Sequence, residues 1–274
     1  MRSQTIFALL MCWAASGCAQ QPTVWTFKER DRIGNNVVTL SGAPGIVEEK
    51  GGRSMCFKGE PDAALLDLNP IAGWSNFTIE VLIKPRTAGT AEQRFLHIED
   101  AHAARVLMEL RIVSPQEWAL DTFLFDSPQS RLTLLDRTKL HSTDEWHWVA
   151  LTYDGATMTH YVDGMRELEG PVAFRAMEQG RMSLGVRLNK VSWYQGCIRE
   201  VRFTPRALAA PQLQTTRANR ARNQRGGTRA YARHSMAASP HCAVALVETP
   251  GASSTGFNTA GASIRFDANC WCAP

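Results

Sequence analysis

Hydrophobic and polar positions alternate most regularly in residues 145–164. Apolar side chains recur there at every second position, at Val149, Leu151 and Tyr153, which places them on one face of a β-strand while the residues between them point the other way. Asp154 and Gly155 follow with the dipeptide of a tight hairpin, and a second β-branched and aromatic run ends at a similar turn, Asp163 and Gly164. The segment therefore predicts two consecutive antiparallel strands.

Turn residues interrupt the rest of the chain in the same way. Glycine and proline recur about every 8–15 residues up to Pro205, a spacing that favours short antiparallel strands over alternating strands and helices. No internal repeat and no long helical pattern precedes this point. The chain has 274 residues, 44% of them hydrophobic, which is enough for one large sandwich with a buried core. An all-β fold is therefore expected.

Five ordered segments resemble the laminin-G-like domains of the concanavalin A-like lectin/glucanase superfamily. They are the hairpin at 145–164, the polar loop at 31–42, the strands at 51–59 and 75–85, and the closing strand at 196–208. The resemblance covers residues 22–210 and implies a two-sheet antiparallel jelly-roll sandwich. We therefore predict a jelly-roll domain at 22–210, with a leader before it and a tail after it.

The first 18 residues have the layout of a secretory signal peptide. Arg2 precedes an apolar run at 6–13 that is too short to cross a membrane, and small residues follow. Ala15 to Cys18 resembles a bacterial lipobox, which makes Cys18 a candidate for lipidation. A cut after Ala19 would instead release a soluble protein, and both alternatives stay open. We predict an exported protein, either a lipoprotein of the cell envelope that contacts the membrane only through Cys18, or a secreted protein.

Export changes the expectation for the cysteines, because disulfides persist in oxidising compartments. The family resemblance places Cys56 on the first long strand and Cys197 on the closing strand, and implies that these ends of the domain lie close together. A disulfide between them is predicted, with two separate buried thiols as the alternative. The spacing of Cys270 and Cys272 is too tight for a zinc site, and no cofactor is predicted.

Basic charge is concentrated after the predicted domain. Residues 205–274 hold eight arginines and two acidic residues, whereas the whole chain has a formal net charge of +4, so the remainder is slightly acidic. The basic segment lacks the interleaved aromatic residues and the motifs of nucleic-acid-binding proteins. We therefore predict a disordered, Arg-rich tail at 211–274 and no nucleic-acid partner.

Candidate catalytic residues are sparse. Retaining glycoside hydrolases need two carboxyl groups about 5–5.5 Å apart, and relatives in this superfamily carry them at alternate positions of one strand. Glu167 and Glu169 have this spacing and would share a strand face, but they follow directly after a turn, where exposed charges are usual. His147 and His160 are interpreted as a cross-strand pair on the surface. We assign no catalytic residue, and a glycoside hydrolase-like enzyme is the first alternative.

The family resemblance also leads to an expectation about calcium binding. Several laminin-G-like relatives hold a calcium ion with oxygen ligands, as a hard cation requires. Lys58 and Arg199 stand in this chain where the family commonly has aspartate. Two cations would repel the ion, so no calcium is predicted at that site.

Binding is the function class that the resemblance favours. Trp118 and Trp193 fall in predicted connections, where exposed rings stack on sugars, and partial packing under a loop is the alternative for both. We predict a non-catalytic module that binds carbohydrate at the cell envelope. A protein interaction or adhesion domain with an envelope protein as its partner is the second alternative, because a fold does not fix a function.

Overall fold

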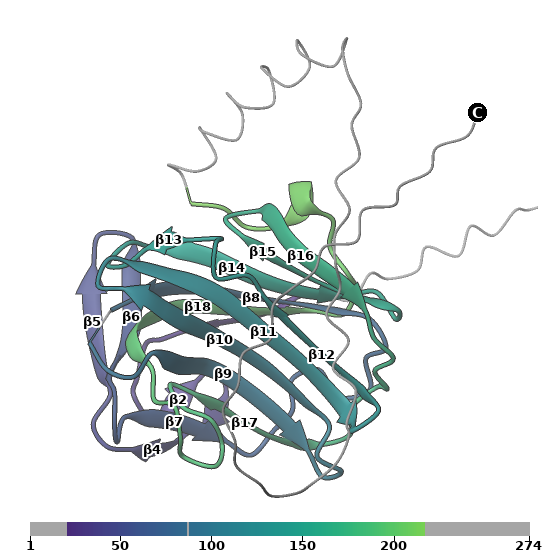
Figure 1. The fold of residues 1–274 in the computed structure, drawn as a ribbon. Coiled ribbons are helices and arrows are strands. Elements are labelled where there is room, and N and C mark those ends of the chain that lie inside the picture. Colours follow the sequence, from purple (N-terminus) through teal and green to yellow (C-terminus); the bar gives the residue numbers. More distant parts are fainter. Residues whose placement is uncertain (1–20, 87, 217–274) are drawn as a thin grey trace, which may run out of the picture. The chain divides into compact units, whose positions relative to one another are not determined.

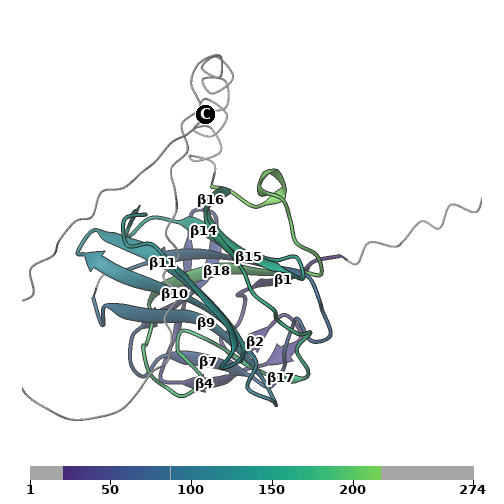
Figure 2. The ribbon, with the colours of Figure 1, turned by 45° about the vertical axis from the view of Figure 1, so that its right-hand side comes forward.

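The structure is a computed structural model that describes residues 21–86 and 88–216. Antiparallel strands form two eight-stranded sheets, and Figures 1 and 2 show these sheets stacked as two layers. The predicted all-β jelly-roll sandwich is therefore confirmed. The first sheet has the strand order β16 (Met165–Pro171), β15 (Thr157–Val162), β14 (His147–Tyr153), β8 (Phe77–Pro85), β18 (Gln195–Thr204), β6 (Gly52–Lys58) and β5 (Gly45–Glu49), and β1 (Thr23–Thr26) also pairs with β18.

The second sheet carries the longest strand, β11. Its order is β12 (Ser130–Leu135), β11 (Glu117–Ser127), β10 (Arg105–Ser114), β9 (Glu92–Asp100), β17 (Gly180–Leu184), β7 (Ala63–Leu66) and β4 (Thr39–Ser41), and β13 (His141–Ser142) also pairs with β11. A small hairpin joins β2 (Arg32–Ile33) to β3 (Asn36–Val37), and a single 3-10 turn, η1 (Ala210–Gln212), follows the last strand.

The core lies between the two sheets, because each strand turns alternate side chains inward. β8 contributes Ile79, Val81 and Ile83 from the first sheet, and β10 contributes Val106 and Met108 from the second. All five side chains are fully buried. The intervening residues of β10 point to the opposite, outer face of the second sheet, where the charged side chains of this strand are found.

The hairpin predicted at 145–164 is present as β14 and β15, in antiparallel register. Its outer face is buried as well as its inner face, which the alternating pattern did not predict. The reason is the end of the packed chain, where Leu208 and Leu213 lie against Ala150 and Tyr161. The backbone N–H of Gln214 also donates to Oε1 of Glu80 at 2.7 Å. The packed chain thus continues beyond the predicted boundary at residue 210.

A disulfide joins Cys56 to Cys197, as predicted. The two residues are direct partners in the register of β6 and β18, with their Cα atoms 4.0 Å apart. The bridge links residues 141 positions apart in the sequence. It therefore ties an early strand of the domain to the closing strand.

The predicted leader at 1–18, with Cys18, lies outside the described residues, and so does most of the predicted tail at 211–274. In the part of the chain that the structure describes, no helix combines the length and the apolar character that a membrane crossing requires.

Removing the disulfide should destabilise the domain. We expect the double variant Cys56→Ala/Cys197→Ala to lose about 2–5 kcal/mol of unfolding free energy, because the bridge constrains a long loop of the unfolded chain. Urea denaturation of both proteins under non-reducing conditions measures this loss. Equal midpoints for the variant and the wild type would contradict the prediction.

Candidate functional site

A β-bulge decides which side chains of β9 reach the outer face of the second sheet. Arg94 pairs with Glu109 and Leu96 pairs with Met108, so Phe95 is an extra residue with no partner of its own. Strict alternation would turn Arg94 to the same side as Leu96, into the core. The extra residue instead leaves Phe95 and Leu96 both in the core and turns Arg94 outward.

A row of charged side chains then crosses three strands. Arg94, Glu109 and Asp121 stand opposite one another on β9, β10 and β11. Nε of Arg94 lies 2.6 Å from Oε1 of Glu109. Arg111 Nη2 lies 2.5 Å from Oδ2 of Asp121 and 3.5 Å from Oε2 of Glu109. Glu92 pairs with Arg94 and, at 2.7 Å, with Arg111. We call these five residues the charge ladder.

The β17–β18 loop (residues 185–194) lies against the same outer face. The backbone N–H of Tyr194 donates to the carbonyl of Gly185 at 2.8 Å and closes the base of the loop. Gly185 has φ +86°, and a Cβ atom there would lie 2.4 Å from the ring of Phe57, so the position requires glycine. Leu188 N–H donates to Nδ1 of His97 at 3.0 Å, which holds the loop over β9.

The ladder and the loop enclose a pocket of about 250 Å³. Four arginines, two carboxylates and three less polar side chains line it: Arg94, Arg105, Arg111, Arg187, Glu109, Asp121, Leu107, Phe123 and Thr133. The pocket thus combines a strongly polar wall with an apolar one. This combination is typical of sites in which a few polar groups orient a ligand against apolar surface.

Burial changes the pKa values of the carboxyl groups in the ladder. It raises the pKa of Glu109 to about 7, although Arg94 lowers that pKa. Burial also raises the pKa of Asp121. Glu92 behaves differently, because the pairing with Arg111 and Arg94 outweighs burial and lowers its pKa. The negative charge at the centre of the ladder is therefore reduced near neutral pH.

Arg105 and Arg187 belong to the pocket and not to the ladder. The nearest carboxylate oxygen to Arg105 is Oε2 of Glu99, at 3.9 Å from Nη1. Burial and the nearby charge of Arg187 lower the pKa of Arg105. Burial and the arginines around it, Arg187 first, also lower the pKa of His97 to about 3, so this imidazole is neutral and adds no further positive charge.

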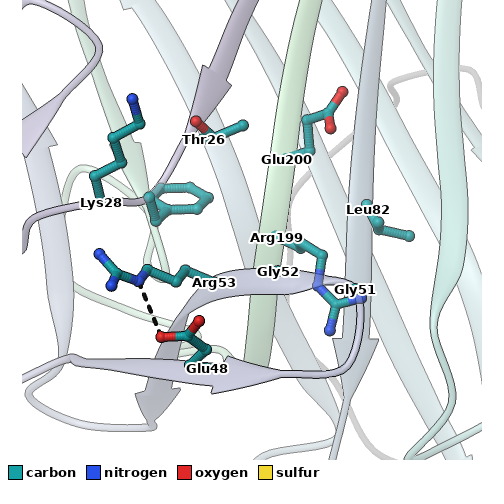
Figure 3. A pocket seen from close by; sticks show the side chains of 10 residues that line it. Thr26, Lys28, Glu48, Gly51, Gly52, Arg53, Leu82, Arg199 and Glu200 are labelled. Atoms are coloured by element: carbon teal, nitrogen blue, oxygen red, sulfur yellow. Dashed lines mark hydrogen bonds and ion pairs between the residues drawn. The ribbon is translucent and has the colours of Figure 1, made fainter.

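A larger pocket, of about 490 Å³, lies on the first sheet between β1, the β5–β6 hairpin and β18 (Figure 3). Its arginines have partners within the protein. Arg53 Nε lies 3.3 Å from Oε2 of Glu48, and Arg199 Nη2 lies 3.2 Å from Oε2 of Glu49. The guanidinium of Arg199 also lies over the ring of Trp146, 3.9 Å from its centroid. The Nε of Arg199 is nevertheless buried without a hydrogen-bond partner. We consider the pocket of the second sheet the stronger candidate because four arginines line it against two carboxylates.

The region of the expected calcium site carries these cations too. Arg199 is engaged with Glu49, and Lys58 is exposed at the end of β6. Among residues 21–86 and 88–216, no group of three or more His, Cys, Asp or Glu side chains is arranged to hold a metal ion.

The two tryptophans proposed for sugar stacking have different surroundings. Trp118 does not lie in an exposed connection as expected; it is 0% exposed in β11. Its Nε1–H donates to the carbonyl of Ser142 at 2.9 Å, and its ring lies 4.9 Å from that of His141. Its ring therefore has no free face for a sugar. Trp193 is half-buried in the β17–β18 loop. Its backbone forms an isolated β-bridge with Arg94, which lines the pocket.

The histidines that were interpreted as a surface pair are in fact buried. The register places Leu151, and not His147, opposite His160. His147 Nδ1 lies 2.8 Å from Oδ2 of Asp163, and His160 Nδ1 lies 2.9 Å from Oγ1 of Thr122 on the other sheet. His147 has the same alternation as Val149 and Leu151, and His160 stands opposite Leu151, so both side chains point inward. Their polar partners make this burial tolerable.

Glu167 and Glu169 do not form a carboxylate pair on one face. Glu167 is the extra residue of a bulge between β15 and β16 and lies 2.8 Å from Nε2 of His141. Glu169 is exposed and pairs with Arg166. The expectation of a shared strand face was wrong because the bulge breaks the alternation.

The two antiparallel sheets define the protein as a jelly-roll domain. The chain belongs to the laminin-G-like family of the concanavalin A-like lectin/glucanases superfamily. The sequence profile of this family matches residues 58–214. No curated protein matches the chain significantly.

Similar solved structures include two toxin domains. The receptor-binding domain of botulinum neurotoxin D has a TM-score of 0.51 and 11% identity over 74% of this chain and 52% of that chain. The binding domain of Paraclostridial Mosquitocidal Protein 1 has a TM-score of 0.51 and 15% identity over 69% and 49%. Domain 4 of an extracellular arabinanase from Geobacillus stearothermophilus, in complex with arabinotriose, has a TM-score of 0.47 and 18% identity over 65% and 87%. The chain spans about half of each toxin domain, and the likeness to these two toxin domains shows the fold alone.

The burial of the two tryptophans predicts different effects of their removal. Trp118→Ala should lower the unfolding free energy by about 3–5 kcal/mol, the usual cost of deleting a buried aromatic side chain. Trp193→Ala should cost clearly less, because its ring is already half-exposed. Chemical denaturation measures both values. A Trp118→Ala protein as stable as the Trp193→Ala protein would contradict the burial described above.

The raised pKa of Glu109 predicts a pH-dependent stability. The pKa moves from an ordinary 4.5 to about 7, so the folded protein binds an extra proton between these values. The stabilisation is therefore complete below pH 4.5 and is lost as pH rises through 7, by about 3 kcal/mol at 1.36 kcal/mol per pH unit. Glu109→Gln, which resembles the protonated form, should remove this change.

The measurement is the difference in unfolding free energy between wild type and Glu109→Gln at several pH values. This difference cancels the contributions of other groups. Glu117→Gln, at an exposed position on β11, is the matched control. A wild-type minus Glu109→Gln difference that stays constant from pH 4 to pH 8 would show that the carboxyl is not perturbed by burial.

Proposed function

We propose that the protein is an exported, non-catalytic module that binds carbohydrate at the cell envelope, and that the ligand lies in the pocket of the second sheet. The observation that carries this proposal is the composition of the pocket. Leu107 and the half-buried ring of Phe123 offer an apolar wall, and guanidinium groups face it from the loop and from β10. A sugar ring has matching parts, because its apolar face stacks on aromatic rings while its oxygens accept hydrogen bonds from N–H groups.

The comparisons support a binding role at the level of the fold. The two toxin structures with the same fold are named as binding domains. The specific ligand of this chain is proposed from its own pocket.

The disulfide supports the proposed export, because such bonds persist in oxidising compartments. We retain the proposal of a leader at 1–18 that ends either at a lipidated Cys18, as in a lipoprotein, or at a cut after Ala19. The mass of the natural N-terminal peptide separates these two products, and an unprocessed Met1 would contradict both.

Screening the full chain on a glycan array tests the proposed function. We expect binding to a defined set of glycans, and a loss of about tenfold in affinity for Phe123→Ala, since about 1.4 kcal/mol of stacking corresponds to that factor. Phe123→Tyr, which keeps the ring, should retain binding. Calorimetry with one array hit quantifies both variants. Binding to an envelope protein with no glycan bound would overturn the proposal in favour of a protein interaction domain.

One observation favours an enzyme as the second candidate. Glu109 and Asp121 are cross-strand partners that line the same pocket, and a carboxyl group with a pKa of about 7 suits a general acid. Both carboxylates, however, are held by arginines of the ladder at 2.6 and 2.5 Å. Release of reducing sugar from a bound glycan by the wild type, and its loss in Glu109→Gln, would establish the enzyme and contradict the non-catalytic proposal.

A further inference from the structure

The pocket on the second sheet holds more positive than negative groups. Four arginines and two carboxylates line it. Two carboxylates outside the pocket also pair with these arginines: Glu92 with Arg94 and Arg111, and Glu99 with Arg105 at 3.9 Å. Glu99 is shared with Arg181, at 3.3 Å. Five arginines thus face four carboxylates, so one guanidinium remains in excess even when every carboxyl group is ionised.

Arg187 and Arg105 are the arginines of the pocket with the weakest pairing, since Arg105 has only Glu99 as an ion-pair partner, at 3.9 Å. Arg94 and Arg111 are used by the ladder. The Nε of Arg105 is buried and has no hydrogen-bond partner among the described residues. The guanidinium of Arg187 has no hydrogen bond or ion pair within residues 21–86 and 88–216. These two groups are also close enough for the charge of Arg187 to act on Arg105.

Phe125 fixes the position of one of these two groups. The guanidinium of Arg105 lies over the Phe125 ring, with its central carbon 4.1 Å from the ring centroid. Stacking uses the flat face of a guanidinium, whereas its N–H donors lie in the plane of the group. Arg105 is therefore held in place, and its side chain is 22% exposed to solvent.

An unpaired buried donor beside a second cation is costly unless a ligand compensates it. We propose that the pocket binds an acidic sugar, whose anionic group pairs with Arg105 and Arg187 while its ring lies against Leu107 and Phe123. This inference rests on the proposed carbohydrate-binding function and adds the chemical class of the sugar. A planar carboxylate matches the fork of a guanidinium, so a uronate is the expected ligand.

The size of the pocket limits how much of a glycan it recognises. Its volume of about 250 Å³ is below the roughly 300–1,000 Å³ of pockets for drug-sized ligands. One sugar unit therefore enters, and its neighbours stay outside. Specificity is expected to depend on the acid group of that unit and not on the length of the glycan.

The decisive comparison uses the same sugar with and without its charge. Calorimetry of the full chain is performed with oligosaccharides of galacturonate and of glucuronate, and with their methyl esters, which keep the ring and lose the charge. We expect the acid to bind at least about tenfold more tightly than its ester, and its affinity to fall as salt is raised. This comparison needs no variant of the protein.

Substitution identifies the residues that recognise the acid. Arg105→Gln and Arg187→Gln should each lower the affinity for the acid about tenfold and leave the affinity for the ester unchanged. Arg131→Gln, at an exposed position on β12 of the same sheet, is the matched control and should bind the acid like the wild type. Thermal melts establish that each variant is folded.

The outcomes separate this inference from the proposed function. Equal affinity for acid and ester, or acid binding that survives both substitutions, would overturn the acidic-sugar inference and leave carbohydrate binding in place. Failure of every glycan to bind would overturn both. A sulfated analogue that binds more tightly than the uronate, and depends on the same two arginines, would support an acidic sugar and assign the anion as sulfate.

Discussion

Charge that is buried on a sheet surface has to be neutralised, and this constraint governs the outer face of the second sheet. Arg94, Glu109, Arg111 and Asp121 satisfy it by pairing across three strands at short distances. The ladder fixes the floor of the pocket. Beside the ladder, Arg105 has Glu99 as its nearest carboxylate, at 3.9 Å, and Arg187 has no ion-pair partner among the described residues. The proposed binding site therefore lies where the ladder leaves guanidinium groups weakly paired.

The disposition of the ladder depends on two irregular features of an otherwise regular sandwich. The bulge at Phe95 turns Arg94 outward, and the glycine at position 185 lets the β17–β18 loop return over β9. Regular alternation in β9 and a short turn between β17 and β18 would remove these two features. The same fold without these features would present a flatter and less charged surface, which is how related jelly rolls can share a scaffold and differ in ligand.

The sequence predicted the scaffold well because alternation and turn chemistry are local signals. The hairpin at 145–164 was found in this way, whereas the strands that hold Cys56 and Cys197 were placed by the family resemblance. The site was harder to predict, since its residues come from three strands and a loop whose register the sequence does not reveal. The charged residues Arg105, Glu109 and Arg111 at odd positions were a usable signal of a charged sheet face. Two adjacent apolar residues between Arg94 and His97 interrupt the alternation, and this interruption was a usable signal of the bulge. Trp118 was misplaced because its neighbours Pro115 and Gln116 indicate a turn, whereas the strand begins at Glu117.

The central claim is that the ligand meets the guanidinium of Arg105, and the most direct measurement is the NMR signal of its Nε–H group. The account predicts that this signal shifts when a uronate oligosaccharide is added, because the guanidinium to which it belongs then gains an anionic partner. The backbone signals of the first sheet should stay unchanged. An Arg105 signal that is unaffected while signals around Arg53 and Arg199 shift would place the ligand in the other pocket and contradict the account.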